Sequence, residues 1–247
     1  MYKFFITQKQ IEQNTAKILG EDVKHIANVL RLKKLDDIII CNKNTNYSYE
    51  AKINEITKEY IMCDIIKKIE ETVESDMDID LYQGLPKTDK MEYIIQKATE
   101  LGVKNIYPVS MERCIVKIDK KCEMKKIERW NKIAESAAKQ SKRDYIPKVE
   151  NIINIENICQ KAKKYDIIIV AYENEKENTL KTVLKKIDLQ NNLKIGVVIG
   201  PEGGIAEDEV KELAKSGAKI VSLGNRILRT ETASLVVLSN IIYEYEL

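Results

Sequence analysis

The sequence predicts a small β-barrel followed by a larger α/β domain with a mostly parallel sheet. Over the first 70 residues apolar and polar positions alternate as in strands, whereas from Ile79 onward apolar strand-like runs alternate with helical ones. Strands that are apolar throughout and separated by helices indicate a parallel sheet covered by helices on both faces. We expect a barrel at residues 1–72, a linker in the acidic stretch 73–78 and an α/β domain at 79–247.

The predicted barrel combines strand-like runs with one helix. The runs are YKFFI, DDIIICN, YSYEAKINEIT and EYIMCDIIKKI, with breaks at Gly20 and at the polar segment 42–46. The helix spans residues 22–32. We expect Asp22 to be its N-cap, because a short carboxylate side chain can accept hydrogen bonds from the first free N–H groups of a helix.

The predicted α/β domain alternates regularly. Its strands are IDLYQG, VKNIYPVS, DIIIVAY, LKIGVVIG and AKIVSLG, and its helices span residues 90–101, 123–142, 156–164, 178–186, 207–215 and 231–245. The last helix (ASLVVLSNIIY) is apolar on nearly every side, so we expect it to be buried against the sheet or against a partner subunit.

The rare residues exclude several kinds of site. His25 is the one histidine, and the five cysteines form no C-x-x-C pair, so a zinc site, an iron–sulfur cluster or a disulfide framework is not expected. The N-terminus lacks a signal-peptide core, and no apolar run approaches the roughly 18 residues that a membrane span needs. We expect a reduced, cytoplasmic protein without a metal.

The formal net charge of +2 hides an uneven distribution. Residues 84–148 carry 16 basic and 9 acidic side chains, and within them residues 120–143 carry nine basic and three acidic ones. A solvated helix face is the ordinary role of such a run, but the shortage of acids leaves i,i+4 pairing incomplete. We therefore expect this helix to contact phosphates.

Two glycine-containing turns follow two predicted strands that are successive in the sequence. GPEGG, at residues 200–204, follows one strand and precedes a helix, which is where open α/β sheets bind nucleotides. The motif is not a P-loop, Pro201 lacks an N–H donor, and the next helix begins with three acids, so the turn suits a neutral or cationic ligand. A merely structural turn is the alternative.

The second turn is LGNRILRTETA, residues 223–233, in which we expect Thr230 to cap the final helix. It holds two of the six arginines of a chain with 35 lysines, and the planar guanidinium fork suits a specific contact. The alternative is that Arg229 pairs with Glu231 or Glu202 and only braces the loop. A third motif, KMEYIIQKATELG, is an amphipathic helix that also suits an ordinary covering role.

Together the motifs resemble one family. QKATELGV, AAKQSKRDYIP, GPEGG and LGNRILRTETA, in this order, are similar to motifs of the ribosomal RNA small subunit methyltransferase E family, SPOUT enzymes that methylate N3 of a uridine in 16S ribosomal RNA. HIANVLR at residues 25–31 resembles the early H-x-x-x-V-L-R segment of that family. The resemblance spans nearly the whole chain, and four ordered motifs are far more specific than one.

The resemblance implies a PUA-like N-terminal barrel and a SPOUT-type domain whose last segment threads a trefoil knot, a feature that general topology rules disfavour. It implies S-adenosylmethionine as cofactor, held by loops at residues 171–173, 199–204 and 222–229. The expected cofactor contacts are Ala171, Tyr172, Ile199, Gly200, Pro201, Glu202, Gly203, Gly204, Leu223, Gly224, Ile227, Leu228 and Arg229. It also implies a homodimer.

Uracil N3 must lose a proton to become a nucleophile, and no metal is needed. We expect Arg229 to stabilise the uracil anion, Arg226 to position the loop or the RNA backbone, and Glu202, Glu231 or water to act as base. The expected RNA contacts are His25, Arg31, Lys87, Arg113, Lys139, Gln140, Lys142 and Arg143. The competing interpretations are a non-catalytic ribosomal RNA-binding or assembly protein, and a SPOUT enzyme acting on transfer RNA or on a ribose 2′-hydroxyl.

Overall fold

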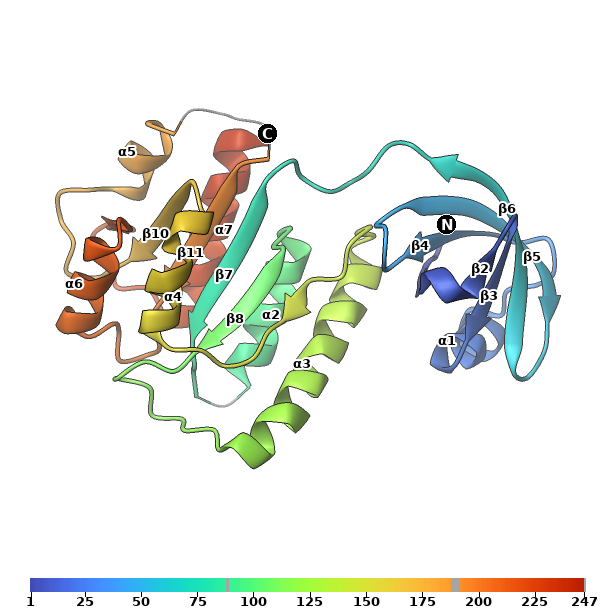
Figure 1. The fold of residues 1–247 in the computed structure, drawn as a ribbon, viewed down its shortest axis with the longest axis horizontal. Coiled ribbons are helices and arrows are strands. Elements are labelled where there is room, and N and C mark those ends of the chain that lie inside the picture. The colour runs from blue at the N-terminus through green and yellow to red at the C-terminus, as the bar shows by residue number, and fades with distance from the viewer. Residues whose placement is uncertain (88, 188–191, 247) are drawn as a thin grey trace. The chain divides into compact units, whose positions relative to one another are not determined.

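The computed structural model describes residues 1–87, 89–187 and 192–246, which divide into two compact units (Figure 1). The N-terminal unit contains Met1–Glu74 and Ala138–Ile146, and the C-terminal unit contains Ser75–Ala137 and Pro147–Leu247. Residues 138–146 fall within the predicted 79–247 domain but pack with the N-terminal unit. None of the described helices is long and apolar enough to cross a membrane.

The N-terminal unit is built on a curled sheet (Figure 1). In the described residues its strand order is β1-β4-β5-β6-β3-β2; β1 and β4 are parallel and the other neighbours are antiparallel. The strands are β1 (Lys3–Ile6), β2 (Ile11–Glu12), β3 (Thr15–Leu19), β4 (Asp37–Asn42), β5 (Ser48–Ile56) and β6 (Tyr60–Ile69). Alternate residues of these strands, among them Ile18, Ile40 and Ile53, form the core of the unit.

The helix of this unit differs from the prediction. α1 spans Glu21–Lys24 and continues as a π-helical turn, His25–Leu30, which ends at Arg31 in a left-handed conformation. Its N-cap is Gly20, at φ 75°, and the predicted cap Asp22 lies inside the first turn. The carboxylate of Asp22 instead accepts a hydrogen bond from Lys139 Nζ at 2.9 Å, so the prediction for Asp22 is wrong.

The C-terminal unit contains the predicted parallel sheet. Among the described residues all its strand pairs are parallel, in the order β12-β10-β11-β7-β8-β9. The strands are β7 (Asp78–Gly84), β8 (Asn105–Val109), β9 (Lys148–Val149), β10 (Ile167–Ala171), β11 (Lys194–Ile199) and β12 (Lys219–Val221). β7, β10 and β11 are buried over most of their length, as the apolar runs of β10 and β11 predict, although β7 also buries the polar residues Asp80 and Gln83.

Helices cover both faces of this sheet (Figure 1). They are α2 (Lys90–Glu100), α3 (Lys120–Gln140), α4 (Ile155–Lys161), α5 (Leu180–Leu184), α6 (Glu207–Lys215) and α7 (Thr230–Tyr245). α2 packs against α7 behind the sheet as drawn, and α4, in front of it, packs against α6. Val237, Leu238 and Ile241 of α7 are fully buried, which confirms that the apolar final helix packs against the sheet.

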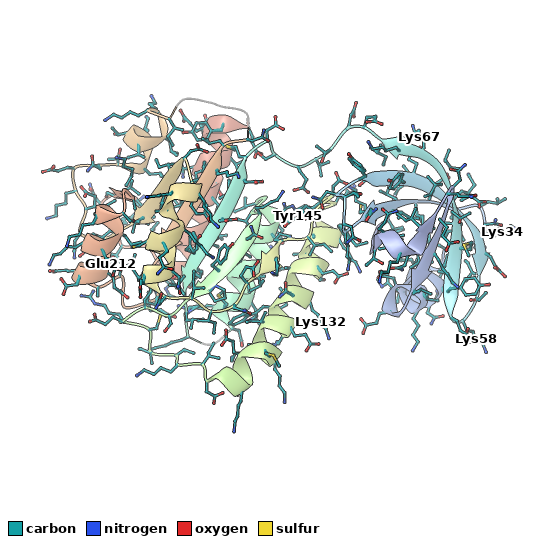
Figure 2. The ribbon with its side chains drawn as sticks, viewed as in Figure 1. Lys34, Lys58, Lys67, Lys132, Tyr145 and Glu212 are labelled. Atoms are coloured by element: carbon teal, nitrogen blue, oxygen red, sulfur yellow. The ribbon has the colours of Figure 1, made fainter. Side chains whose placement is uncertain are left out.

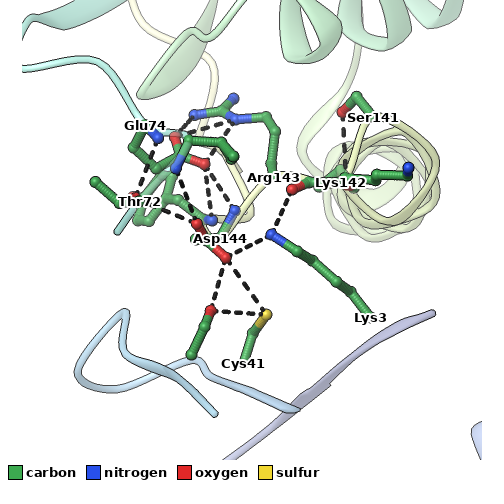
Figure 3. A network of polar contacts seen from close by, with 12 residues as sticks. Lys3, Cys41, Thr72, Glu74, Ser141, Lys142, Arg143 and Asp144 are labelled. Atoms are coloured by element: carbon green, nitrogen blue, oxygen red, sulfur yellow. Dashed lines mark hydrogen bonds and ion pairs between the residues drawn. The ribbon is translucent and has the colours of Figure 1, made fainter. Parts of the chain in front are cut away.

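A buried polar network holds residues 138–146 within the N-terminal unit (Figure 3). The Asp144 carboxylate accepts hydrogen bonds from Lys3 Nζ and Ser48 Oγ, each at 2.6 Å, and from Val73 N–H at 3.1 Å. The side chains of Asp144 and Lys3 are only 4% and 8% exposed. Burial would raise the pKa of Asp144, but these donors, with Lys3 and Ser48 foremost, hold it below its ordinary value.

Candidate functional site

The carboxyl ends of the parallel strands surround a cavity of about 520 Å³ in the C-terminal unit. β12, β10 and β11 lie side by side in this order and are parallel, so the loops that follow them meet at one edge of the sheet. The cavity is lined by Lys90, Ala171, Tyr172, Glu173, Ile199, Gly200, Pro201, Glu202, Gly203, Gly204, Ser222, Leu223, Gly224, Asn225, Arg226, Ile227, Leu228, Arg229, Thr230 and Ala233. All the predicted cofactor contacts are among these residues.

The turn at residues 200–204 requires glycine at two positions around it. A Cβ atom on Gly84, at the end of β7, would lie 2.6 Å from Pro201 Cδ and 2.6 Å from Pro201 N, so the strand and the turn are in backbone contact. Gly204 has φ 73°, and a Cβ there would collide with the carboxylate of Glu173. The absence of side chains thus sets the shape of this wall of the cavity.

A lysine between two carboxylates lies at the cavity. Lys90 Nζ, at the first turn of α2, is 3.2 Å from Glu202 Oε1 and 3.2 Å from Glu231 Oε2. Glu202 also accepts hydrogen bonds from the Lys87 N–H at 3.1 and 3.2 Å. Burial acts to raise the pKa of Glu202, but backbone N–H groups and the Lys90 ammonium lower it overall. Glu231 and Glu202 raise the pKa of Lys90, so this lysine stays charged.

The two arginines of the second turn have unengaged guanidinium groups. Arg226 and Arg229 are exposed residues of the cavity lining, and no ion pair or side-chain hydrogen bond involves either of them within the described part of the chain. The alternative in which Arg229 braces the loop by pairing with Glu202 or Glu231 is therefore wrong. Both carboxylates form their ion pair with Lys90.

Thr230 does not cap α7 as predicted. The N-cap is Arg229, and Thr230 is the first residue of the helix. Its hydroxyl is buried and donates to the carbonyl of Gly200 at 2.6 Å. The prediction failed because a threonine at the start of a helix can bond to another segment of the chain as well as to its own helix, and a sequence pattern does not distinguish the two.

The predicted RNA contacts differ in availability. His25, Arg31 and Lys142 are exposed in the N-terminal unit, as is Gln140. Figure 2 shows further exposed lysines, Lys34, Lys58 and Lys67, on the same unit. In the C-terminal unit Lys87 and Arg113 are exposed, and Arg113 Nη1 donates to the Gly203 carbonyl at 3.2 Å.

Arg143 has a structural role instead of the predicted RNA contact. Its side chain is 6% exposed and forms an ion pair with Glu74, whose carboxylate also accepts the Asp144 N–H at 2.8 Å (Figure 3). Lys139, also predicted to contact RNA, is partly engaged by Asp22. The acids that pair with these cations lie far away in sequence, so the charge pattern of the helix did not reveal them.

Comparison with known proteins places the chain in a family. It matches an RNA methyltransferase domain over residues 73–242 and an RNA methyltransferase PUA domain over residues 18–66. A protein of Bacillus subtilis (strain 168), ribosomal RNA small subunit methyltransferase E, is 38% identical over 252 residues, which cover 100% of this chain and 98% of that protein. The chain belongs to the ribosomal RNA small subunit methyltransferase E family.

Solved structures of similar proteins share this fold. The family member from Neisseria gonorrhoeae, bound to S-adenosyl methionine, has a TM-score of 0.84 at 29% identity and covers 99% of this chain and 98% of its own. A methyltransferase of Legionella pneumophila, in complex with the same cofactor, has a TM-score of 0.84 at 28% identity and covers 98% and 97%. The predicted SPOUT-type and PUA-like architecture is thereby confirmed.

Two residues of this candidate site were not predicted from the sequence. Lys90 belongs to a helix that looked like an ordinary covering helix, and no local motif marks it as a neighbour of Glu202 and Glu231. Gln83, at the end of β7, is fully buried and hydrogen-bonded to Thr230 at 2.8 Å. A glutamine at the carboxyl end of a predicted central strand was the available signal, because a buried amide there needs hydrogen-bond partners.

Proposed function

We propose that the chain transfers a methyl group from S-adenosylmethionine to N3 of a specific uridine in the 16S ribosomal RNA of the small ribosomal subunit. The observation that carries the proposal is the cavity at the strand ends, whose lining includes two guanidinium groups without partners among the described residues. Membership of the family, and the names of its relatives, point to ribosomal RNA as the substrate class.

The cavity suits the proposed cofactor. Its volume of about 520 Å³ falls within the ordinary range for small-molecule sites. Ile199, Leu223 and Leu228 offer apolar surface, and the glycine turn leaves backbone groups accessible. Glu173 lies in the lining and forms no ion pair among the described residues, so its carboxylate can face a sulfonium or ammonium group, whereas Lys90 pairs with Glu202.

Gly84→Ala is expected to weaken cofactor binding at least tenfold. The added methyl group would need the space of Pro201, so the turn at residues 200–204 must move away from the strand. Calorimetric titration with S-adenosylmethionine measures the effect. Gly102→Ala is the control, since a Cβ at Gly102 meets nothing within 4 Å, although its φ of 85° predicts a small loss of stability. If Gly84→Ala bound the cofactor with unchanged affinity, the contact between Gly84 and Pro201 would not determine cofactor binding.

The bound cofactor would supply an electrophilic methyl group on a sulfonium. The residues of the chain must then align the uracil ring in line with that group and stabilise the negative charge that develops as N3 loses its proton. Arg229 can place its planar guanidinium beside a uracil carbonyl oxygen, and Arg226 can position the loop or a phosphate. The target base must leave its stack to reach the cavity.

The surroundings of Glu202 and Glu231 indicate which of the two carboxylates can act as the general base. Glu202 accepts two kinds of donor and has a lowered pKa, so it is a weak proton acceptor. Glu231 Oε2 is buried, and it faces the Lys90 ammonium without a well-directed hydrogen bond from any described residue. We therefore propose that the proton of uracil N3 is accepted by Glu231 or by a water molecule that Glu231 orients.

The RNA is proposed to contact His25, Arg31, Lys87, Arg113, Gln140 and Lys142. Affinity should fall steeply with salt, with a log–log slope of about 0.7 for each phosphate contacted on single-stranded segments. Lys142→Ala should reduce that slope by about one such contact, because the residue is exposed. Filter binding of a 16S fragment at several salt concentrations tests this, and affinity that is insensitive to salt would contradict the assignment.

Two experiments test the proposal as a whole. A deletion strain should lose one 3-methyluridine from its 16S ribosomal RNA, as mass mapping of nucleosides would show; persistence of that nucleoside, or loss of a modification in transfer RNA, would refute the substrate. Heat on titration with S-adenosylmethionine distinguishes an enzyme from a pure RNA-binding protein. We also propose a cytoplasmic homodimer, which a monomer mass at micromolar concentration would contradict.

A further inference from the structure

A buried chain of hydrogen bonds joins the turn at residues 200–204 to the start of α7 and to the end of β7. Thr230 Oγ1 donates to the Gly200 carbonyl at 2.6 Å, and Gln83 Nε2 lies 2.8 Å from Thr230 Oγ1. Ser234 Oγ lies 2.6 Å from Gln83 Oε1, and Gln83 Nε2 also donates to the Gly84 carbonyl at 2.9 Å.

The directions of the bonds at Thr230 and Gln83 are fixed, whereas the single hydroxyl proton of Ser234 is shared between Gln83 Oε1 and the Thr230 carbonyl, which lies 2.9 Å from Ser234 Oγ. The Gly200 carbonyl can only accept, so the single hydroxyl proton of Thr230 must point to it. Thr230 Oγ1 must then accept from the Gln83 amide, which orients Oε1 of Gln83 toward the Ser234 hydroxyl. Gln83 and Ser234 are fully buried and Thr230 is 4% exposed, so water cannot replace a lost partner without rearrangement.

We propose that Gln83, Thr230 and Ser234 are positioning residues. Their hydrogen bonds hold the turn at residues 200–204, which lines the cofactor cavity, in a fixed position relative to Arg229. Gly200 begins the turn that lines the cavity, and Arg229 immediately precedes Thr230. One hydroxyl therefore ties the turn to the residue that carries the proposed catalytic guanidinium. The backbone contact between Gly84 and Pro201 supports the turn from the β7 side, next to Gln83.

The functional consequence follows from the demands of methyl transfer. An in-line transfer depends on alignment, and a misplacement of about 1 Å can cost on the order of a hundredfold in rate. If the Thr230 hydroxyl is removed, the Gly200 carbonyl loses its buried donor and the turn can shift relative to α7. This inference rests on the proposed function and deepens it, since it names residues that act on the cofactor through the turn.

The test compares Thr230→Val with Thr230→Ser. Valine keeps the shape of threonine without the hydroxyl, and serine keeps the hydroxyl. We expect Thr230→Val to weaken S-adenosylmethionine binding about tenfold, the size expected for a buried acceptor left unsatisfied, and to lower kcat as well. Thr230→Ser should stay within about threefold of the unmodified protein, because the same bond can form. Calorimetry and steady-state kinetics give these values, and both are measured well below the unfolding temperature.

Thr232→Val is the matched control, since Thr232 lies exposed in the same helical turn; it should change neither quantity. Ser234→Ala, which leaves the Thr230 bond in place, tests the far end of the chain if Thr230→Val does not fold, and a threefold or greater loss of affinity is expected. A lowered unfolding temperature with unchanged affinity and kcat in Thr230→Val, or in Ser234→Ala if Thr230→Val does not fold, would overturn the inference. If the unmodified protein bound no S-adenosylmethionine, the proposed function would fail first, and this inference with it.

Discussion

Replacing Arg229 with alanine is expected to reduce methyl transfer by a factor of roughly 10² to 10³, the usual loss when one group that stabilises developing charge is removed. Arg229 is exposed, lines the cavity and has no side-chain partner among the described residues, so its removal breaks no packing or ion pair. The fold should therefore persist. Single-turnover methylation of a 16S fragment, beside circular dichroism and thermal unfolding, measures both effects.

Arg229→Lys separates charge from geometry. A lysine keeps the positive charge but lacks the planar fork that can bond two atoms of a uracil edge, so we expect partial recovery of the rate, well short of the original. Cofactor affinity should change less than the rate in both variants, because the guanidinium acts on the base that loses its proton. Near-normal transfer by Arg229→Ala would show that the uracil anion is stabilised elsewhere.

The secondary structure was predictable where the burial of a strand or helix face produces a regular pattern of apolar residues in the sequence. Strands β10 and β11 are mostly apolar because helices cover both faces of the sheet, and α6 was predicted at its observed bounds, Glu207–Lys215. The hairpin of β2 and β3 was missed. Its strands are short, and its turn depends on Gln13 at φ 49°, a conformation that glutamine does not signal. The trefoil knot stays a prediction from the resemblance.

The cofactor loops were predicted from the resemblance to the family. The resemblance placed these loops, and the sheet explains why they meet: β10 lies between β12 and β11, so the turns that follow these three parallel strands lie at one edge. What could not be predicted were contacts between segments far apart in the chain. Lys90 reaches Glu202 and Glu231, and Arg143 reaches Glu74, through tertiary packing that no local pattern records.

Asp144→Ala is expected to destabilise the N-terminal unit by about 3–5 kcal/mol, the cost of removing one partner from a buried ion pair. Lys3 would keep its buried ammonium without the carboxylate at 2.6 Å, and Ser48 and Val73 would lose their acceptor. Hydrogen exchange of the β1 amides should accelerate accordingly. The matched control is Asp37→Ala, because Asp37 lies on the same sheet with a 59% exposed side chain paired to Lys52, and exposed pairs contribute little.

The charge of Asp144 also predicts how this stability depends on pH. The folded-state pKa of Asp144 is lowered, so its contribution is present above the unfolded value of about 3.9 and is lost as the pH falls through the folded value. Asp144→Asn keeps the size of the side chain but cannot ionise. The free energy of opening measured by hydrogen exchange of the β1 amides should be lower in Asp144→Asn than in the unmodified protein. This difference should be constant near neutral pH and shrink below about pH 4. A difference that persisted unchanged in acid would mean that the loss of a hydrogen-bond acceptor oxygen, and not the loss of the carboxylate charge, distinguishes Asp144→Asn from the unmodified protein.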